Sequence, residues 1–214
     1  LCRDRGLFMR FPPNNLGSKV VIQNIRSKRH YSEKKTKIRK ELVKKRKLFH
    51  FQSEDYSNNA AGNLIRFFNS TNYSIIDKNI AIYWPIGSEI NTIPSIAALF
   101  EFGAKISLAS TENGIIKYRL WEHHDKIEVN KLGITINTKE VKIPDVIICP
   151  LLGFDKNLHR LGRGGGYYDK SLHKFKNTIK IGFAYSIQKI KIVPIEKHDI
   201  SMDAIITEKA IYKK

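Results

Sequence analysis

The chain has 214 residues, 42% of them hydrophobic, which is enough for one globular domain with a full hydrophobic core. No apolar run is long enough to cross a bilayer, and the two cysteines, Cys2 and Cys149, form neither a disulfide framework nor a metal-binding pattern. The net charge of +18 suggests nucleic acid, but residues 1–50 hold 16 Lys and Arg against 3 acids, whereas the other 164 residues hold 22 against 17. Because the body is only mildly basic, we expect no binding to nucleic acid. Because the apolar runs are short, we expect a soluble protein that does not bind membranes.

Residues 1–31 form a basic extension with seven Lys and Arg, one acid and no clear periodicity. They contain no uninterrupted apolar segment of the kind that a secretory signal needs. The composition is compatible with a mitochondrial leader, in which case Met9 can be an internal start, but it equally fits a disordered extension or upstream sequence outside the mature protein. We favour the second interpretation and expect a cytoplasmic protein, with a mitochondrial location as the alternative if the segment is a cleaved leader.

Two helices are predicted after this extension. Ser32 is the predicted N-cap of the first, with Glu33 in its first turn, and Lys or Arg fills the faces that its apolar stripe leaves free. Ser53 is the predicted N-cap of the second. The apolar stripe of the first helix comprises Ile38, Leu42 and Phe49, and that of the second comprises Tyr56, Ala60, Leu64 and Phe68.

Strands and helices then alternate. A short helix is predicted near residues 93–102, with Pro94 in its first turn and Gly103 as its stop. The run 144–152 is typical of a strand buried on both faces, so Cys149 is predicted to be a buried structural thiol. This alternation predicts an α/β fold, a single three-layer domain over 32–214 with a mostly parallel central sheet. Its strands are predicted at 79–84, 104–109, 115–121, 144–152, 178–185 and 203–208.

The stretch RLGRGGGYYDK, residues 160–170, is the most informative part of the sequence, because four of the 13 glycines fall within it. It lies between the buried strand and a helix predicted over residues 167–175, a context in which backbone N–H groups can surround an anion. Arg160 and Arg163 can donate forked hydrogen bonds to phosphate oxygens, and a carboxylate such as Asp169 suits Mg²⁺. The loop has neither the Walker A ending nor the Rossmann glycine spacing.

The segment LGRGGGYYDKSL resembles the signature of 5-formyltetrahydrofolate cyclo-ligases, also called methenyltetrahydrofolate synthetases. The resemblance covers residues 34–208 in order, through KTKIRKELVKKRK, YWPIGSEINT, PDVIICPLLGFD, the glycine loop and the segment from GFAYSIQKI to IITE. It implies a layered α/β fold, a monomer, and conversion of 5-formyltetrahydrofolate to 5,10-methenyltetrahydrofolate, with ATP as co-substrate, Mg²⁺ as cofactor, and ADP and phosphate as products.

The resemblance also implies roles for individual residues. For ATP it implies Lys35 and Arg39, with Lys37 as a competitor if the register slips, and the loop residues Arg160, Leu161, Gly162, Arg163, Gly164, Gly165, Gly166, Tyr167 and Tyr168. For the folate it implies Trp84, Glu89, Arg163, Gly164, Gly165, Gly166 and Tyr167, of which Arg163 and Tyr167 are also the catalytic candidates. For the metal it implies Asp169 and Asp199. Taken alone, Tyr167 or Tyr168 can be the first core residue of the following helix, Trp84 can be a core residue at a strand end, and Glu89 fits an ordinary loop acid.

Two positions depart from the family pattern. Relatives carry a Gly-Ile-x-Glu-Pro turn that helps to shape the substrate site, whereas this chain has LGITINT at 132–138, and Ala109 stands where relatives tend to have proline. Both departures lie on the folate side. A diverged paralogue that binds nucleotide but has lost or altered its folate chemistry is therefore the alternative to an active cyclo-ligase. We assign no role to His123 and His124, which we expect to diverge in or just after a strand, or to His198.

Overall fold

The computed structural model describes residues 15–51, 56–130, 133–141, 143–196 and 199–214. The helices are α1 (Asn15–His50), α2 (Tyr56–Ser70), α3 (Ile93–Glu101), α4 (Tyr167–Leu172) and the 3₁₀ turn η1 (Ser186–Gln188). The strands are β1 (Asn79–Ile82), β2 (Lys105–Glu112), β3 (Ile115–Leu120), β4 (Glu128–Asn130), β5 (Gly133–Thr135), β6 (Glu140–Val141), β7 (Val146–Pro150), β8 (Gly153–Phe154), β9 (Arg160–Leu161), β10 (Ile179–Phe183), β11 (Ala204–Ile206) and β12 (Ile211–Lys213).

The central sheet has the order β12-β11-β10-β7-β1-β2-β3-β6, and β5 also pairs with β2. Strands β2, β1, β7, β10 and β11 are parallel, whereas β3, β6 and β12 run antiparallel to their neighbours. The carboxyl ends of the parallel strands therefore meet at one edge of the sheet, where the loops after β1 and β7 begin. Open α/β sheets bind ligands in this position. The predicted α/β class with a mostly parallel sheet is confirmed.

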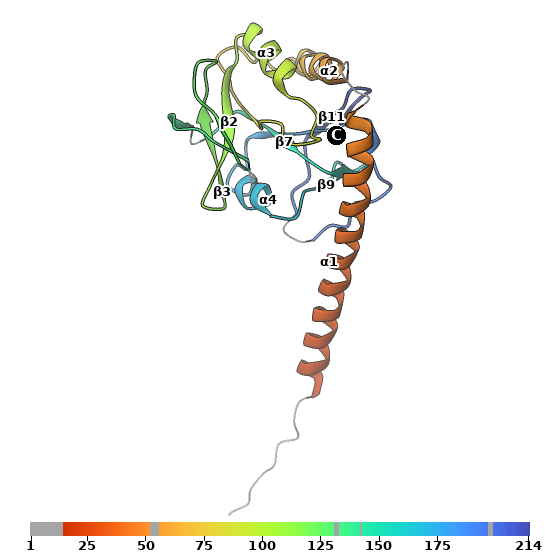
Figure 1. The fold of residues 1–214 in the computed structure, drawn as a ribbon. Coiled ribbons are helices and arrows are strands. Elements are labelled where there is room, and N and C mark those ends of the chain that lie inside the picture. Colours follow the sequence, from red (N-terminus) through yellow and green to blue (C-terminus); the bar gives the residue numbers. More distant parts are fainter. Residues whose placement is uncertain (1–14, 52–55, 131–132, 142, 197–198) are drawn as a thin grey trace, which may run out of the picture.

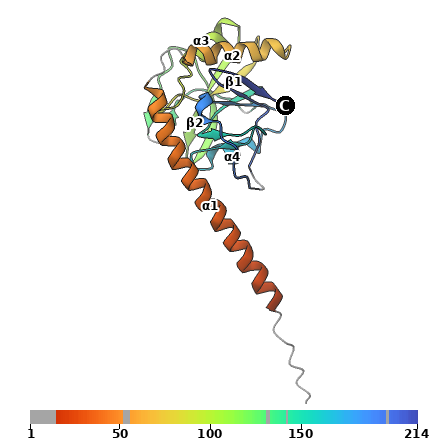
Figure 2. The same cartoon turned by 90° about the vertical axis from the view of Figure 1, so that its right-hand side faces the viewer.

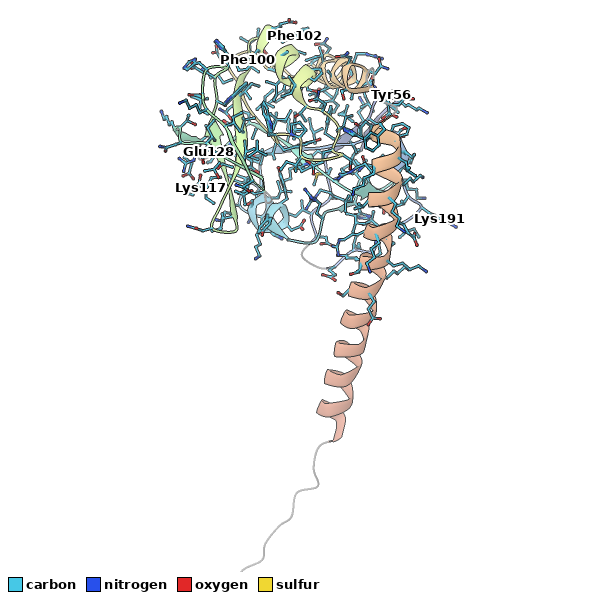
Figure 3. All side chains as sticks on the ribbon, in the orientation of Figure 1. Tyr56, Phe100, Phe102, Lys117, Glu128 and Lys191 are labelled. Carbon is cyan, nitrogen blue, oxygen red and sulfur yellow. The ribbon has the colours of Figure 1, made fainter. Side chains whose placement is uncertain are left out.

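Helices cover both faces of this sheet, as Figures 1 and 2 show. Helices α2 and α3 pack on each other on one face, and α4 lies on the other, next to β3. Side chains fill the space between the layers, whereas Phe100 and Phe102 lie at the outer surface of the α3 region (Figure 3) and are 38% and 47% exposed. The three-layer arrangement predicted from the strand–helix alternation is therefore present.

The core lies along the central parallel strands. Ile80 of β1 is opposite Val146 of β7, and Ile148 of β7 is opposite Ile181 of β10, all of them buried. β-Branched residues on both faces of a strand are typical of a parallel sheet covered by helices. Cys149 is fully buried in this core as predicted, and burial raises the pKa of its thiol to about 12, so it is not a reactive thiol.

The predicted secondary structure is largely confirmed after residue 56. The stripe of α2 is correct, because Ala60, Leu64 and Phe68 are buried and Tyr56 packs against the same core. Pro94 lies in the first turn of α3, and Gly103 follows its end with a φ of +80°. Ser53, the predicted cap of α2, lies outside the described residues.

The start of the first helix is wrong in the sequence-based prediction. Helix α1 begins at Asn15, so Ser32 lies inside it and does not cap it. The segment contains no proline and only one glycine, Gly17, and its many Lys and Arg residues are good helix formers. The first part of α1 projects from the rest of the molecule in both views (Figures 1 and 2). No described helix is both long enough and apolar enough to cross a membrane.

The prediction that the His123 and His124 side chains diverge is also wrong. They lie in a turn after β3, and their rings meet edge to face with centroids 5.4 Å apart. In a turn the side chains do not alternate as they do in a strand, which explains why they converge. Both residues are exposed and outside the site described below.

Candidate functional site

A cavity of about 330 Å³ opens at the carboxyl edge of the sheet. It lies between α1, the turn after β1, the β2–β3 hairpin, β5, and the glycine loop that connects β9 to α4. The cavity thus collects segments from most of the length of the chain. Of the residues predicted to bind ligands, its lining includes Lys35, Arg39, Trp84, Glu89, Arg160, Gly162, Arg163, Gly164, Gly165, Gly166, Tyr167, Tyr168, Asp169 and Asp199.

Leu161 is the exception among these predictions. It alternates with Arg160 in the short strand β9, so the two side chains point to opposite sides. Arg160 faces the cavity, whereas Leu161 is 1% exposed and packs with Leu42 and Val193 in a small apolar cluster. The Leu161 side chain therefore contributes to packing and does not line the cavity.

One end of the cavity contains an ion pair between Lys35 of α1 and Asp199 of the C-terminal segment. The Nζ of Lys35 donates to Oδ2 of Asp199 at 2.7 Å and lies 3.8 Å from Oε2 of Glu196. Lys35 is 7% exposed, because it lies on the packing face of α1. A predicted phosphate ligand and a predicted metal ligand are thus each other's partners. Lys37 is exposed and absent from the lining, so the structure does not support it as the competitor of Lys35.

Arg160 and Asp169 form a second pair of the same kind. The Nη2 of Arg160 donates to Oδ1 of Asp169 at 2.6 Å, and its Nη1 donates to the Pro150 carbonyl at 3.2 Å. The guanidinium carbon also lies 5.5 Å from the centre of the Tyr168 ring, within the range of a cation–π contact. These contacts fix the orientation of the Arg160 side chain at the base of the glycine loop.

The glycine loop depends on its backbone conformation and on Arg39. Gly164 and Gly166 have φ values of +107° and +68°, which side chains with a Cβ rarely adopt. The Nε of Arg39 donates to the carbonyl of Gly162 at 2.9 Å and so ties the loop to α1. The loop ends at Gly166, which immediately precedes the six-residue helix α4, shorter than the helix predicted to reach Phe175.

Glu89 lies at the other end of the cavity, in a turn that follows β1. It is only 5% exposed, its Oε2 accepts the Ile86 N–H at 3.1 Å, and its Oε1 lies 3.6 Å from Nη1 of Arg163. Burial raises the pKa of the Glu89 carboxyl, while Arg46, the Ile86 N–H and Arg163 oppose this rise. A buried acid with this surrounding is not an ordinary loop residue.

Aromatic rings form the walls between these two ends. The Trp84 ring packs edge to face on Trp121, with centroids 6.0 Å apart, and also lines the cavity, so it is a packing residue and a wall residue at once. The Tyr167 ring lies between Gly165 of the loop and Gly114 of the β2–β3 turn. Tyr168 packs against the core and lines the cavity as well, and burial raises its pKa well above the usual range.

Two predicted metal ligands, Asp169 and Asp199, line the same cavity. Their chemistry fits Mg²⁺, which prefers oxygen ligands and commonly takes one or two carboxylates together with substrate phosphates. Each carboxylate already pairs with a cation, however, and the described residues contain no group of three or more His, Cys, Asp and Glu side chains that could hold a metal ion. The residues therefore fit a metal that binds together with phosphate oxygens.

The sequence-based prediction missed several residues of the site. Arg46 is the most notable, because it is 4% exposed and donates from Nε to Ser88 Oγ at 3.1 Å, next to Glu89. Its position was visible in the sequence, because it falls on the apolar stripe of α1, four residues after Leu42. Tyr83 and Glu196, unlike Arg46, line the cavity itself. Four other basic residues of α1 are exposed and absent from the described lining of the cavity: Lys40, Lys44, Lys45 and Lys47.

One of the two departures from the family pattern, Ala109, lines the cavity, whereas Ile136 and Asn137, which stand where relatives carry Glu-Pro, are absent from its described lining. Ala109 of β2 and Gly133 and Ile134 of β5 line the cavity on the side of the β2–β3 hairpin. A Cβ at Gly133, a residue that the family turn shares, would lie 2.8 Å from Oγ1 of Thr111, so this position requires glycine.

Comparison with known proteins places this site in a family. A profile of the 5-formyltetrahydrofolate cyclo-ligase family matches residues 31–208. The 5-formyltetrahydrofolate cyclo-ligase of Escherichia coli is 27% identical over an alignment of 150 residues that covers 65% of this chain and 82% of the relative. That of Saccharomyces cerevisiae is 39% identical over an alignment of 159 residues that covers 60% and 75%, respectively.

A solved structure agrees with the sequence comparisons. The 5,10-methenyltetrahydrofolate synthetase of Aquifex aeolicus superimposes with a TM-score of 0.68 and 28% sequence identity, covering 84% of this chain and 92% of the other. The family match extends over the glycine loop, the Glu89 turn and most of α1, which are the segments that build the cavity. The chain therefore belongs to the 5-formyltetrahydrofolate cyclo-ligase family.

Proposed function

We propose that the protein converts 5-formyltetrahydrofolate to 5,10-methenyltetrahydrofolate, with hydrolysis of ATP to ADP and phosphate and with Mg²⁺ as cofactor. The observation that carries this proposal is the shared cavity, which has basic side chains and a glycine loop at one end, a buried carboxylate at the other, and aromatic rings in its walls. A ring closure driven by phosphoryl transfer needs both ends, because the nucleotide and the folate must meet at one point.

At the basic end, Lys35, Arg39 and Arg160 would bind the phosphates of ATP. Lys35 and Arg160 now pair with Asp199 and Asp169, so an arriving polyphosphate can take over the two cations and release the carboxylates from these ion pairs. Asp169 and Asp199 would then hold Mg²⁺, which supplies charge neutralisation at the phosphate oxygens. This exchange of partners predicts that nucleotide and metal bind jointly.

At the other end, Glu89 would accept two N–H donors from the pterin ring in a bidentate pairing. The Trp84 and Tyr167 side chains offer flat faces against which the ring can stack. Because Glu89 is buried, a substrate group that pairs with it gains a charge-assisted hydrogen bond that water screens only weakly.

Chemistry would take place between these ends. The formyl oxygen attacks the γ-phosphorus of ATP and ADP leaves. The neighbouring amine nitrogen, N10 of the folate, then attacks the activated carbon and gives up its proton to solvent, and phosphate departs in place of a poor oxide leaving group. Arg163 and Tyr167 line the cavity from the glycine loop, and Nη1 of Arg163 lies 3.6 Å from Oε1 of Glu89. Their roles would be to neutralise charge on the transferring phosphoryl group and to orient the folate.

The test is the growth of the methenyl product's ultraviolet absorbance band. Purified protein is mixed with 5-formyltetrahydrofolate, Mg²⁺ and ATP, and ATP is omitted in the control. We expect the band to grow only when ATP is present. A flat trace from folded protein would contradict the proposal.

A diverged paralogue is the second candidate function, because Ala109 and the segment 132–138 depart from the family on the folate side of the cavity. Such a protein would bind ATP through the same basic end but would not turn over 5-formyltetrahydrofolate. Nucleotide binding measured by calorimetry on protein that gives a flat absorbance trace would favour this function.

A further inference from the structure

We propose that Arg46 is a positioning residue that acts through Glu89. From behind the cavity wall, Arg46 holds the turn Ile86–Glu89 in place and keeps the Glu89 carboxylate charged for the substrate. This inference rests on the proposed function, in which Glu89 accepts N–H donors of the pterin.

The geometry places Arg46 behind Glu89 and not beside the ligand. The Nε of Arg46 donates to Oγ of Ser88 at 3.1 Å, and Ser88 is the residue that immediately precedes Glu89. Arg46 is 4% exposed, whereas Glu89 lines the cavity and Arg46 is absent from its described lining. The guanidinium group therefore reaches the turn from the protein side, where a bound ligand does not displace it.

The burial of Arg46 itself points to this role. Arg46 lies on the packing face of α1 together with Leu42, a position that an apolar residue would fill at lower cost, because burying a charge is unfavourable without a partner. Burial lowers the pKa of Arg46, and Glu89 is the strongest group that opposes this effect. The two buried charges thus stabilise each other, and Ser88 satisfies the Arg46 Nε–H.

The groups that face Glu89 differ in how they affect the ionisation of its carboxyl. Arg163 belongs to the glycine loop and its side chain is 55% exposed, so water screens it and phosphates compete for it. Tyr83 and Tyr168 are neutral phenols at neutral pH, because burial raises both of their pKa values well above the usual range. Of the described groups that face Glu89, Arg46 is the buried, permanent charge that favours the ionised carboxylate.

The charge state of Glu89 decides which hydrogen bonds its carboxyl can form. An ionised carboxylate accepts hydrogen bonds at both oxygens, whereas a protonated one donates from one of them and cannot match two N–H donors. Burial pushes the Glu89 pKa upwards, and Arg46 counteracts it. Without Arg46 the carboxyl would be protonated at a higher pH, and folate binding would be lost on the acidic side of the pH profile.

The first experiment measures the KM for 5-formyltetrahydrofolate against pH in wild type, Arg46→Met and Arg46→Lys. We expect Arg46→Met to raise the folate KM by about tenfold on the acidic side, with the difference shrinking as the pH rises, because each unit of pKa shift is a factor of ten. Arg46→Lys restores a charge and should return the acidic limb towards wild type. Lys47→Met, which removes an exposed charge from the next position, should leave the profile unchanged.

Two further variants separate this role from a merely structural one. In a Glu89→Gln background, Arg46→Met should have little additional effect on the folate KM, because it acts through Glu89. Ser88→Ala, which keeps both charges but removes the hydrogen bond, should raise the folate KM several-fold without moving the acidic limb. Equal effects of Arg46→Met in the wild-type and Glu89→Gln backgrounds, or an unshifted acidic limb, would overturn the proposal.

An NMR titration needs no turnover, so it tests the role of Arg46 independently of the proposed function. The side-chain carboxyl ¹³C signal of Glu89, followed by NMR against pH in protein without ligand, should titrate at higher pH in Arg46→Met than in wild type. An unchanged titration would refute the role of Arg46 even if the enzyme is active. If wild type forms no methenyl product but the titration shifts, the proposed function fails and the link between Arg46 and Glu89 stands.

Discussion

Replacing Asp169 by Asn should destabilise the protein by removing the counterion of Arg160. The Arg160 side chain is 4% exposed and donates to Asp169 at 2.6 Å, so the variant leaves a buried guanidinium without its charge partner. Removing one partner of a fully buried pair costs about 3–5 kcal/mol. Asp169 is 25% exposed and Asn keeps one acceptor oxygen, so we expect about 2 kcal/mol. For a chain of this size the Tm should fall by about 4–8 °C.

Thermal unfolding followed by circular dichroism measures this change. Asp77→Asn is the matched control, because Asp77 pairs with Lys105 at 3.1 Å but both side chains are largely exposed, and its Tm should stay within about 2 °C of wild type. The double variant Arg160→Gln/Asp169→Asn should cost less than the sum of its single variants. Asp169→Asn should also need more Mg²⁺ for half-maximal activity. An unfolding temperature equal to that of the Asp77→Asn control would refute the reasoning.

Three further predictions concern the cavity. Arg163→Ala should raise the KM for ATP and lower kcat, and a steady-state assay with unchanged values for both would contradict its catalytic role. In wild type the folate KM should rise as the pH falls through the raised pKa of Glu89, whereas Glu89→Gln should show a high folate KM that does not vary with pH and an unchanged ATP affinity by calorimetry. Gly165→Ala places a Cβ 2.9 Å from the Tyr167 ring and should lower kcat/KM for folate by about ten- to hundredfold, whereas Gly62→Ala, in the open middle of a helix, should leave activity unchanged.

The elements that could be predicted are those whose signal is local. The apolar run 144–152 contains the buried strand β7, and the helical spacing of Ala60, Leu64 and Phe68 marks the buried face of α2. Both patterns follow from the periodicity of one element, so they need no knowledge of the rest of the chain. The start of α1 was wrong because a good N-cap residue such as Ser32 is also tolerated inside a helix that continues through it.

The residue types of the site were also evident in the sequence. The glycine loop, its two arginines and Asp169 lie within ten positions, and the order of the motifs along the chain identified the family. What stayed open was whether Glu89 is a loop acid, whether Trp84 is a core residue, and whether Asp169 and Asp199 meet in space. These questions concern burial and distance, which depend on how the chain folds and cannot be read from separate motifs.

The sequence by itself thus determined the α/β class, the buried strands and the chemistry of the glycine loop, because these depend on neighbouring residues. Only the tertiary structure decided that Lys35 meets Asp199, 164 positions away, and that Arg46 is buried behind Glu89. The parallel sheet brings the loops after β1 and β7 to one edge, and α1 packs across that edge with a face that carries charges as well as apolar groups. Which of its many basic residues are buried depends on what each one meets there, and that is a property of the assembled fold.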